Sequence, residues 1–516
     1  MFTQDEKDNL QAMAFRISNS LTRRAYDGLR KFTKDQMNLQ SKYVADRILE
    51  SASELRPEIY DCCVGSCVCF VGEFENHTNC PICDEPRYDQ RKKSRNRFRY
   101  IPILPRLQAV FKDPKLIQLM LHRVRRESDP NIIEDVLDGG VIQRLLETHV
   151  KIDGKKQNFK YGEFDTDIFI ALTCDGISVH KGVGARRSKT QYSCYPMEII
   201  ILNLPPMIRT QDRYVFSLSV IPGPREPKHF NSFCWPLYQE CLRGLEGVPT
   251  YHTIRRNIFP LHVYLVHIFG DLKAMIKALS TLGVGAIKPC HTCHIEAICD
   301  QHAKRKTYYL PLTIPGHAEN RLQDVLNNPR THRDYLETYH RLDTAAMESE
   351  RKRIRKETGI KHPSIFALLP YFDMGCVIPG GFMHAIYINL FKALIQLWCG
   401  EFKGLDAGTG NYIIPAPIWE RIRIETRNAV NTTPASFVRS MPNIDTDFGN
   451  FTAEDSAFWM TWLAPYLLAG RLPEPYYSHM LDLVKIVKTC TGFGITKEEH
   501  AKLSVDIYNW RLDYEE

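Results

Sequence analysis

Four cysteines near the start of the chain have the spacing of a metal site. Three residues separate Cys63 from Cys67, two separate Cys80 from Cys83, and twelve lie between the pairs. Thiolates carried in pairs on tight turns are common ligands of structural Zn²⁺, which they hold tetrahedrally. The spacing therefore predicts a four-thiolate zinc site.

Neighbouring residues leave the ligand set open. Cys62 and Cys69 lie beside the first pair, and His77 precedes the second, so each could replace one of the four cysteines. Some of these thiols could instead be small buried apolar groups, since free cysteine is often buried. Two turn-spaced pairs together favour metal, which would substitute for a core in a segment too small to have one.

Two aspartates each follow an apolar run that predicts a strand. Asp175 follows DIFIALTC, and Asp271 follows HVYLVHIFG. If these strands are neighbours in a sheet, both carboxylates emerge at the same edge and can share one or two Mg²⁺ ions. Such ions serve phosphoryl transfer, because they activate the attacking oxygen and stabilise the leaving one. Taken singly, each aspartate could simply belong to a turn.

A second cysteine pair, Cys290 and Cys293, occurs in the string PCHTCH. Two ligands cannot close a tetrahedral zinc site, so distant histidines would have to complete it. His384 in FMH is the first candidate, while His294 and His302 are nearer in sequence. The alternative is a partly exposed pair that binds no metal.

Three basic clusters could neutralise DNA phosphates. They consist of Arg91, Lys92, Lys93, Arg95 and Arg97, of Lys181, Arg186, Arg187 and Lys189, and of the run at 350–356. Phe98 and Tyr100 beside the first cluster favour nucleic acid, although nuclear import would suit it equally. Glutamates next to 350–356 favour a solvated charged face there.

Predicted elements must position these groups. Residues 1–58 and 103–150 have helical character, and residues 321–360 predict a charged helical insertion. From residue 164 three strand-like runs end in Gly or Pro, and a helix at 233–245 and a fourth strand, HVYLVHIFGD, follow them. The predicted order is strand, strand, strand, helix, strand.

The overall composition limits the class of protein and the number of domains. The 516 residues are 44% hydrophobic and 25% charged, which is globular and long enough for two to four domains. No apolar run of about 18 residues and no signal-peptide layout occur, so we expect a soluble, unsecreted protein. The 16 cysteines, several in CxxC-type pairs, favour metal binding in a reducing compartment. The net charge of +7 permits a polyanionic partner without establishing one.

Residues 175–240 carry several signatures in order: DG after a strand, YSCYP, NLPP, IPGP and PLYQE. This series closely resembles the transposase family of CACTA (En/Spm, CMC superfamily) elements, especially its fungal branch. The similarity extends upstream to YDCC and CPICDEPRY. Downstream it includes GDLKA, PCHTC, LPYFDM, FMH and FTAED, so that it covers roughly residues 58–490.

The resemblance implies a ribonuclease-H-like catalytic domain that cuts and joins DNA at transposon ends with Mg²⁺ or Mn²⁺. Asp175 and Asp271 correspond to the first two catalytic acids, with water as the first nucleophile and a strand 3′-hydroxyl as the second. The cysteine pair after the second aspartate also resembles the layout of the V(D)J recombinase, in which distant histidines return before the third acid.

A transposase of this class needs a third carboxylate on a late helix. Family members carry acids around the MH motif, but the matching positions here are Gly381 and Ile388. Glu401 and Glu454 are the remaining candidates. The first could instead be a solvated helix-end charge, and the second a helix N-terminal acid favoured by the macrodipole.

We therefore predict an α/β protein in which a ribonuclease-H-like domain with a helical insertion follows a Cys-rich zinc module and a helical N-terminal segment. The predicted N-terminal parts are a helical segment at 1–58, a zinc module with a basic tail at 59–100 and a helical linker at 101–160. The first part of the core is predicted at 161–300 and the helical insertion at 301–370. The remainder of the core and a C-terminal helical region are predicted at 371–516. Family members usually continue beyond the point where this chain ends, which predicts a shortened copy.

The predicted function is metal-dependent transposition, with Mg²⁺ or Mn²⁺ at the catalytic acids and structural Zn²⁺ at the cysteines. Double-stranded DNA at transposon ends is the expected partner, with no membrane and no small-molecule substrate, and a homo-oligomer is left open. Nuclear localisation follows from the substrate alone. The alternatives are an inactive, degenerate or domesticated transposase that acts as a DNA-binding or interaction protein, and a metal-dependent nuclease without transposition.

Overall fold

The computed structural model describes residues 2–53, 55–178, 193–299, 308–313, 328–376, 381–402, 411–434, 437 and 451–516. The chain divides into two compact units. Unit 1 is Met1–Ile117, Ile177–Met197 and Phe216–Leu261, and unit 2 is Gln118–Gly176, Glu198–Val215 and His262–Glu516. In the described ranges no helix is long and apolar enough to cross a membrane.

Unit 1 begins with three helices, as the periodicity predicts. They are α1 (Gln4–Ser18), α2 (Arg23–Phe32) and α3 (Lys42–Ser53). Thr3 and Glu6 form a capping box that satisfies backbone N–H groups at the start of α1. Met13 and Tyr26 are buried in a small core that these helices share.

The main sheet has the strand order β1-β2-β9-β8-β6-β12. Its strands are β1 (Glu58–Asp61), β2 (Arg97–Tyr100), β9 (Phe216–Ile221), β8 (Ser193–Ile201), β6 (Ile168–Cys174) and β12 (Val263–Phe269). Strand β8 contributes residues to both units. In unit 1, β2 pairs antiparallel with β1 and β9; in unit 2, β6 and β12 are parallel. The sheet is therefore mixed.

The predicted order of strands and helix is confirmed. The three predicted strands are β6, β8 and β9, the helix is α9 (Phe230–Glu246), and the fourth strand is β12. The hairpin of β10 (Val248–His252) and β11 (Asn257–Leu261) was not predicted. Burial alternates along β10, which is a period-2 signal, but a proline in each strand weakens the pattern.

Strands β6 and β12 are almost completely buried, which explains why both read as continuous apolar runs. The Asn203 side chain fixes the start of β6. Its amide donates to the Asp167 carbonyl at 2.8 Å, and its oxygen accepts from the Phe169 N–H at 2.8 Å. The asparagine of the NLPP signature therefore has a structural role.

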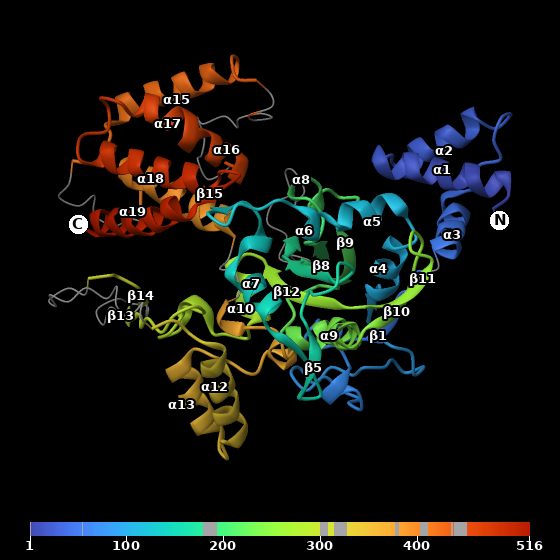
Figure 1. Ribbon diagram of the computed structural model, residues 1–516. Helices are drawn as coiled ribbons and strands as arrows, with labels where there is room; N and C mark the ends of the chain where they lie inside the picture. The colour runs from blue at the N-terminus through green and yellow to red at the C-terminus, as the bar shows by residue number, and fades with distance from the viewer. Residues whose placement is uncertain are drawn as a thin grey trace. The chain divides into compact units, whose positions relative to one another are not determined.

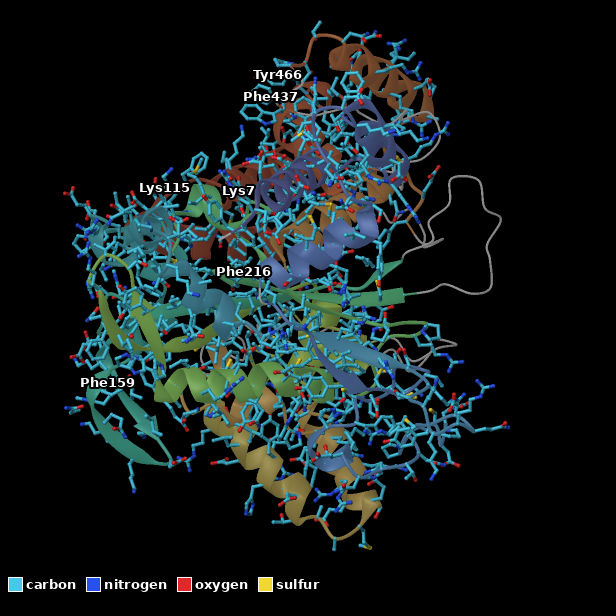
Figure 2. The ribbon with its side chains drawn as sticks, turned by 90° about the vertical axis from the view of Figure 1, so that its right-hand side faces the viewer. Lys7, Lys115, Phe159, Phe216, Phe437 and Tyr466 are labelled. Carbon is cyan, nitrogen blue, oxygen red and sulfur yellow. The ribbon has the colours of Figure 1, made fainter. Side chains whose placement is uncertain are left out.

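The remaining elements up to the end of β12 are short. The helices are α4 (Leu104–Val110), α5 (Pro114–Met120), α6 (His122–Arg125), α7 (Gly140–Glu147) and α8 (Pro206–Arg209). The strands are β3 (Ile132–Ile133), β4 (His149–Ile152), β5 (Lys155–Lys160) and β7 (Ile177–Ser178). Phe159 lies on the hairpin that β4 and β5 form (Figure 2).

The rest of unit 2 is mainly helical. It contains α10 (Leu272–Ala278), α12 (His332–Thr344), α13 (Glu348–Thr358), α14 (Phe391–Trp398), α15 (Ala416–Val430), α16 (Ala453–Phe458), α17 (Ala464–Leu467), α18 (Tyr476–Cys490) and α19 (Lys497–Glu515). Short strands β13 (Ile298–Cys299), β14 (Tyr308–Tyr309) and β15 (Ile495–Thr496) complete it. Figure 1 shows α12 and α13 as a helical pair, as expected of the insertion.

The C-terminal helices of unit 2 share a hydrophobic core. Phe391, Ile422, Trp459 and Val487 are all buried in it. The indole N–H of Trp459 donates to the Thr426 hydroxyl at 3.0 Å, so the largest buried side chain also has a polar partner. Figure 2 shows this helical region with Phe437 and Tyr466 labelled on it.

In unit 1 a buried carboxylate joins α9 to the start of α4. Glu240 is 2% exposed, and it accepts hydrogen bonds from the Tyr100 hydroxyl at 2.5 Å, the Ile103 N–H at 2.8 Å and the Leu104 N–H at 2.9 Å. It thereby satisfies N–H groups at the start of a helix whose own N-cap side chain provides no bond. The last residue of the PLYQE signature is thus structural.

Replacing Glu240 with Ala should destabilise unit 1 strongly. Three buried donors would lose their acceptor, at a cost of roughly 3 to 5 kcal/mol in unfolding free energy. Urea denaturation followed by circular dichroism measures the change. Glu246→Ala, at an exposed position of the same helix, should change stability by less than about 0.5 kcal/mol. Equal effects of the two substitutions would contradict this account.

Candidate metal centres

The structure brings the four predicted cysteines of unit 1 together. The Sγ atoms of Cys63, Cys67, Cys80 and Cys83 all lie within 4.8 Å of one another, and those of Cys63 and Cys83 are 3.5 Å apart. A tetrahedral zinc ion with Zn–S bonds of about 2.3 Å separates its sulfurs by about 3.8 Å. The cluster therefore has the donor type and the size of a four-thiolate zinc site.

Each cysteine pair lies on a tight turn. The Ser66 N–H donates to the Cys63 carbonyl, and the Asp84 N–H to the Cys80 carbonyl, both at 2.8 Å. Ser66 and Asp84 have positive φ angles of 59° and 58°, which closes each turn. The Gly65 N–H points to the Cys63 sulfur at 3.3 Å. Such N–H groups orient and stabilise a thiolate.

The other candidate ligands lie outside this cluster. Cys62 and Cys69 face each other in an isolated antiparallel bridge, and His77 is exposed with its ring 5.8 Å from that of Phe74. In the described part of the chain, the four-cysteine cluster is the one group of three or more Cys, His, Asp or Glu residues close enough to hold a metal ion together.

The thiols of the cluster must lose protons to bind metal. Burial raises the pKa of the Cys80 thiol to about 11 and also raises the pKa of Cys67 above its ordinary value. In the absence of metal these two groups are protonated at neutral pH. Metal binding therefore releases protons, and the affinity of the cluster for metal falls as the pH is lowered.

In unit 2 the strands that carry the two aspartates are parallel neighbours. The register pairs Thr173 of β6 with Phe269 of β12. Asp175 and Asp271 each lie two residues further on, so both emerge at the carboxyl ends of adjacent strands. Asp175 is exposed and Asp271 is half-buried.

Each aspartate also has a local role. The Asp175 carboxylate accepts the Gly176 N–H at 2.7 Å, and Asp271 is the N-cap of α10, where its Oδ1 accepts the Ala274 N–H at 2.7 Å. Each aspartate therefore has the local backbone bond that the turn interpretation predicted. These bonds orient the carboxylates and involve one oxygen of each, so they are compatible with metal binding through the other oxygen.

Gly270 permits close approach of the two strand ends. A Cβ atom at this position would lie 2.7 Å from the Ala274 Cβ, which is too short for a real contact, and 3.0 Å from the Cys174 carbonyl oxygen, which is tight. The glycine before Asp271 is therefore required by the tight junction between β6, β12 and α10.

Residues 147–322 match the sequence model of the transposase family tnp2. This match supports a transposase family. It contains Asp175, Asp271 and the second cysteine pair, whereas the four-cysteine cluster lies before it and Gly381 after it. No curated protein matches the chain.

The first position predicted for a third acid, Gly381, lies beside Gly270, the residue before Asp271. The Gly381 N–H donates to the Gly270 carbonyl at 2.9 Å, one residue before Asp271. A Cβ at Gly381 would have its nearest neighbours at 3.9 Å, so a side chain fits there. Ile388 is half-buried one to two helical turns further on.

The other candidate acids lie near helix ends. Glu401 is exposed after the end of α14, and Glu454 is exposed in the first turn of α16. Asp455 is buried and forms a capping box with Thr452. Among the described residues, no third Cys, His, Asp or Glu forms a compact metal-binding group with Asp175 and Asp271.

The second cysteine pair is not joined by its predicted partners. The Cys290 sulfur contacts the Thr292 hydroxyl at 3.2 Å and its N–H at 3.4 Å. His294 lies 3.3 Å from the Asp334 carboxylate instead. Within the described ranges neither His294 nor His384 forms a metal-binding group with the pair, and His302 lies outside the described residues.

The basic cluster after the zinc module is exposed, but its aromatic neighbours are not. Arg91, Lys92, Lys93, Arg95 and Arg97 are all exposed. Phe98 and Tyr100 are fully buried, because alternate side chains of β2 face α9, where the Phe98 ring lies 5.2 Å from that of Phe233 and Tyr100 bonds to Glu240. The expectation that these rings contribute to nucleic-acid contact is therefore wrong.

The other two basic clusters have different outcomes. Lys181, Arg186, Arg187 and Lys189 lie outside the described residues. The run at 350–356 lies on α13, where Glu348 pairs with Arg355 at 2.7 Å and Glu357 pairs with Arg353 at 3.5 Å. These pairs agree with the solvated charged face that the neighbouring glutamates predicted.

The zinc content of the protein should fall by one ion per chain when Cys63 is replaced by Ala. Loss of one thiolate opens the tetrahedral site, and the three remaining sulfurs hold the metal far less tightly. Atomic emission spectrometry of dialysed protein measures this. Cys62→Ala is the matched control, because Cys62 is equally buried but lies outside the cluster. An unchanged content in Cys63→Ala would exclude this zinc site.

Proposed function

We propose that this transposase-derived chain binds transposon-end DNA and cuts and joins its strands by phosphoryl transfer that depends on Mg²⁺ or Mn²⁺. The observation that carries the proposal is the parallel pairing of β6 with β12, which delivers Asp175 and Asp271 to one edge. The signatures of residues 175–240 support assignment to the fungal branch of the CACTA transposases.

A ribonuclease-H-like core is part of this proposal. That interpretation requires the first and fourth strands of the core to be neighbours. The order β9-β8-β6-β12 meets this requirement, since β6 is the first predicted strand and β12 the fourth. Helix α9 precedes β12 in the chain, as the predicted element order requires.

The aspartates act as metal ligands rather than as bases. Backbone N–H groups of Gly176 and Ala274 hold one oxygen of each carboxylate, and an all-oxygen donor set suits Mg²⁺ or Mn²⁺. The bound metal would activate the attacking oxygen and stabilise the leaving one. The attacking oxygen belongs to water during cleavage and to a strand 3′-hydroxyl during joining.

DNA binding draws on basic residues outside the acid pair. The exposed cluster Arg91, Lys92, Lys93, Arg95 and Arg97 can neutralise phosphates, although Arg95 is partly engaged by Glu85 at 2.8 Å. Lys181, Arg186, Arg187 and Lys189 follow Asp175 in sequence and are proposed to contact the substrate backbone. Action on chromosomal DNA implies a nuclear protein.

Cleavage of labelled DNA that carries the ends of the parent element tests this proposal. With Mg²⁺ or Mn²⁺ we expect cleavage by the wild type and a loss of at least about 100-fold in Asp175→Asn and Asp271→Asn, because each loses a charged metal ligand. Asp271→Asn is the sharper variant, since an amide oxygen can still accept from Ala274 and cap α10.

The matched control is Asp113→Asn, because Asp113 is an exposed aspartate that accepts the Lys115 N–H at the start of α5. It should cleave like the wild type. Cleavage that survives both catalytic substitutions would disprove the assigned acids. No cleavage by well-folded wild type that still binds DNA would favour the inactive DNA-binding protein.

Introducing a carboxylate at position 381 should increase metal-dependent cleavage. Gly381→Asp places an acid beside Asp271 in space that a side chain can occupy, and we expect about a tenfold higher affinity for Mn²⁺. Gly381→Asn is the control, because it has the same shape without the charge. Mn²⁺ titration of the cleavage rate compares the two, and identical titration curves would contradict the prediction.

A further inference from the structure

A long helix of unit 2 begins at the edge that carries the aspartates. It comprises Phe382, the π-helical segment Met383–Leu390 and α14. Gly381 precedes it, and its carbonyl accepts the His384 N–H at 2.9 Å and the Ala385 N–H at 3.1 Å. Because the Gly381 N–H donates to Gly270, the first turn of this helix is attached to the residue before Asp271.

His384 faces the same junction. Its Nδ1 lies 3.9 Å from the ideal Cβ position of Gly381, and the Gly270 carbonyl oxygen lies 3.9 Å from that same position. The ideal Cβ of Gly270 is in turn 3.0 Å from the Cys174 carbonyl oxygen. The imidazole nitrogen and the Gly270 carbonyl oxygen therefore both lie near the side-chain position of residue 381, and Gly270 directly precedes Asp271.

The imidazole is also chemically available. His384 is half-buried, and among the described residues neither of its ring nitrogens has a hydrogen-bond partner. A neutral imidazole with an open lone pair is a common metal ligand. The second cysteine pair, which was predicted to use it, does not bring a sulfur into a metal-binding group with it within the described ranges.

We propose that His384 supplies the third protein ligand of the metal that Asp175 and Asp271 hold. This inference rests on the proposed function and deepens it. The three residues are linked by the hydrogen bond between Gly381 and Gly270 and by the parallel pairing of β6 with β12. An imidazole among the ligands makes the site softer than three carboxylates, so it favours Mn²⁺ over Mg²⁺, which prefers oxygen ligands.

Electron paramagnetic resonance with Mn²⁺ tests the proposal without relying on activity. The full chain, with zinc present, is titrated with Mn²⁺, and electron spin-echo modulation detects any nitrogen bound to the ion. The wild type should show a nitrogen-coupled site. His384→Gln should lose the nitrogen coupling and bind Mn²⁺ about tenfold or more weakly. His340→Gln, at an exposed position of α12, should leave both unchanged.

A second variant tests whether His384→Gln acts only by disturbing the fold. His384→Asp replaces the nitrogen ligand with oxygen, so Mn²⁺ binding should return while the nitrogen coupling stays absent. A nitrogen coupling that persists in His384→Gln would overturn the inference. So would a failure of His384→Asp to bind Mn²⁺ better than His384→Gln.

The aspartate variants separate this inference from the proposed function. If Mn²⁺ binding is unchanged in Asp175→Asn and Asp271→Asn, the proposed function fails and the inference fails with it. If binding depends on both aspartates but the nitrogen signal does not depend on His384, the inference alone is wrong. Loss of binding in the aspartate variants together with loss of nitrogen coupling in His384→Gln supports both.

Discussion

The parallel pairing of β6 with β12 is the constraint on which the candidate catalytic edge depends. Both strands are buried along nearly their whole length, so their register is fixed by packing on both faces. A shift of one residue would turn every side chain to the opposite face and move one aspartate away from the edge. Gly270 adds to this constraint, because a Cβ at this position would lie 2.7 Å from the Ala274 Cβ in the first turn of α10.

Features that depend on local pattern could be predicted from the sequence. The four core strands and α9 follow from residue periodicity and Gly or Pro boundaries, and the cysteine turns follow from ligand spacing. Features that depend on long-range pairing could not. Phe98 and Tyr100 look like an exposed aromatic patch beside arginines until α9, more than 130 residues later in the chain, is packed against β2 and buries both rings. The place of His384 depends on a hydrogen bond between Gly381 and Gly270, which are 111 residues apart in sequence.

Several residues in or near the signatures of residues 175–240 stabilise the fold. The Asn203 side chain bonds the Asp167 carbonyl and the Phe169 N–H at the start of β6. Glu240 accepts three hydrogen bonds from buried donors. The Ser66 hydroxyl, in the turn of the first cysteine pair, donates to the carbonyls of Pro222 and Gly223 in the IPGP string. A buried polar group without a partner costs about 1 to 3 kcal/mol, so such residues tolerate little change.

The charge of the proposed site distinguishes His384 from a third acid. Two carboxylates and a neutral imidazole contribute two negative charges, which balance one divalent ion. Three carboxylates contribute three, and a second divalent ion is then less strongly repelled, because interactions between close charges are large where water is partly excluded. A site with His384 as its third ligand would therefore suit one tightly held ion, and a second ion would depend on the phosphates of the proposed DNA substrate. With this ligand set, binding of the second metal ion and binding of DNA would be coupled. The phosphate oxygens would supply the negative charge that two aspartates and an imidazole lack.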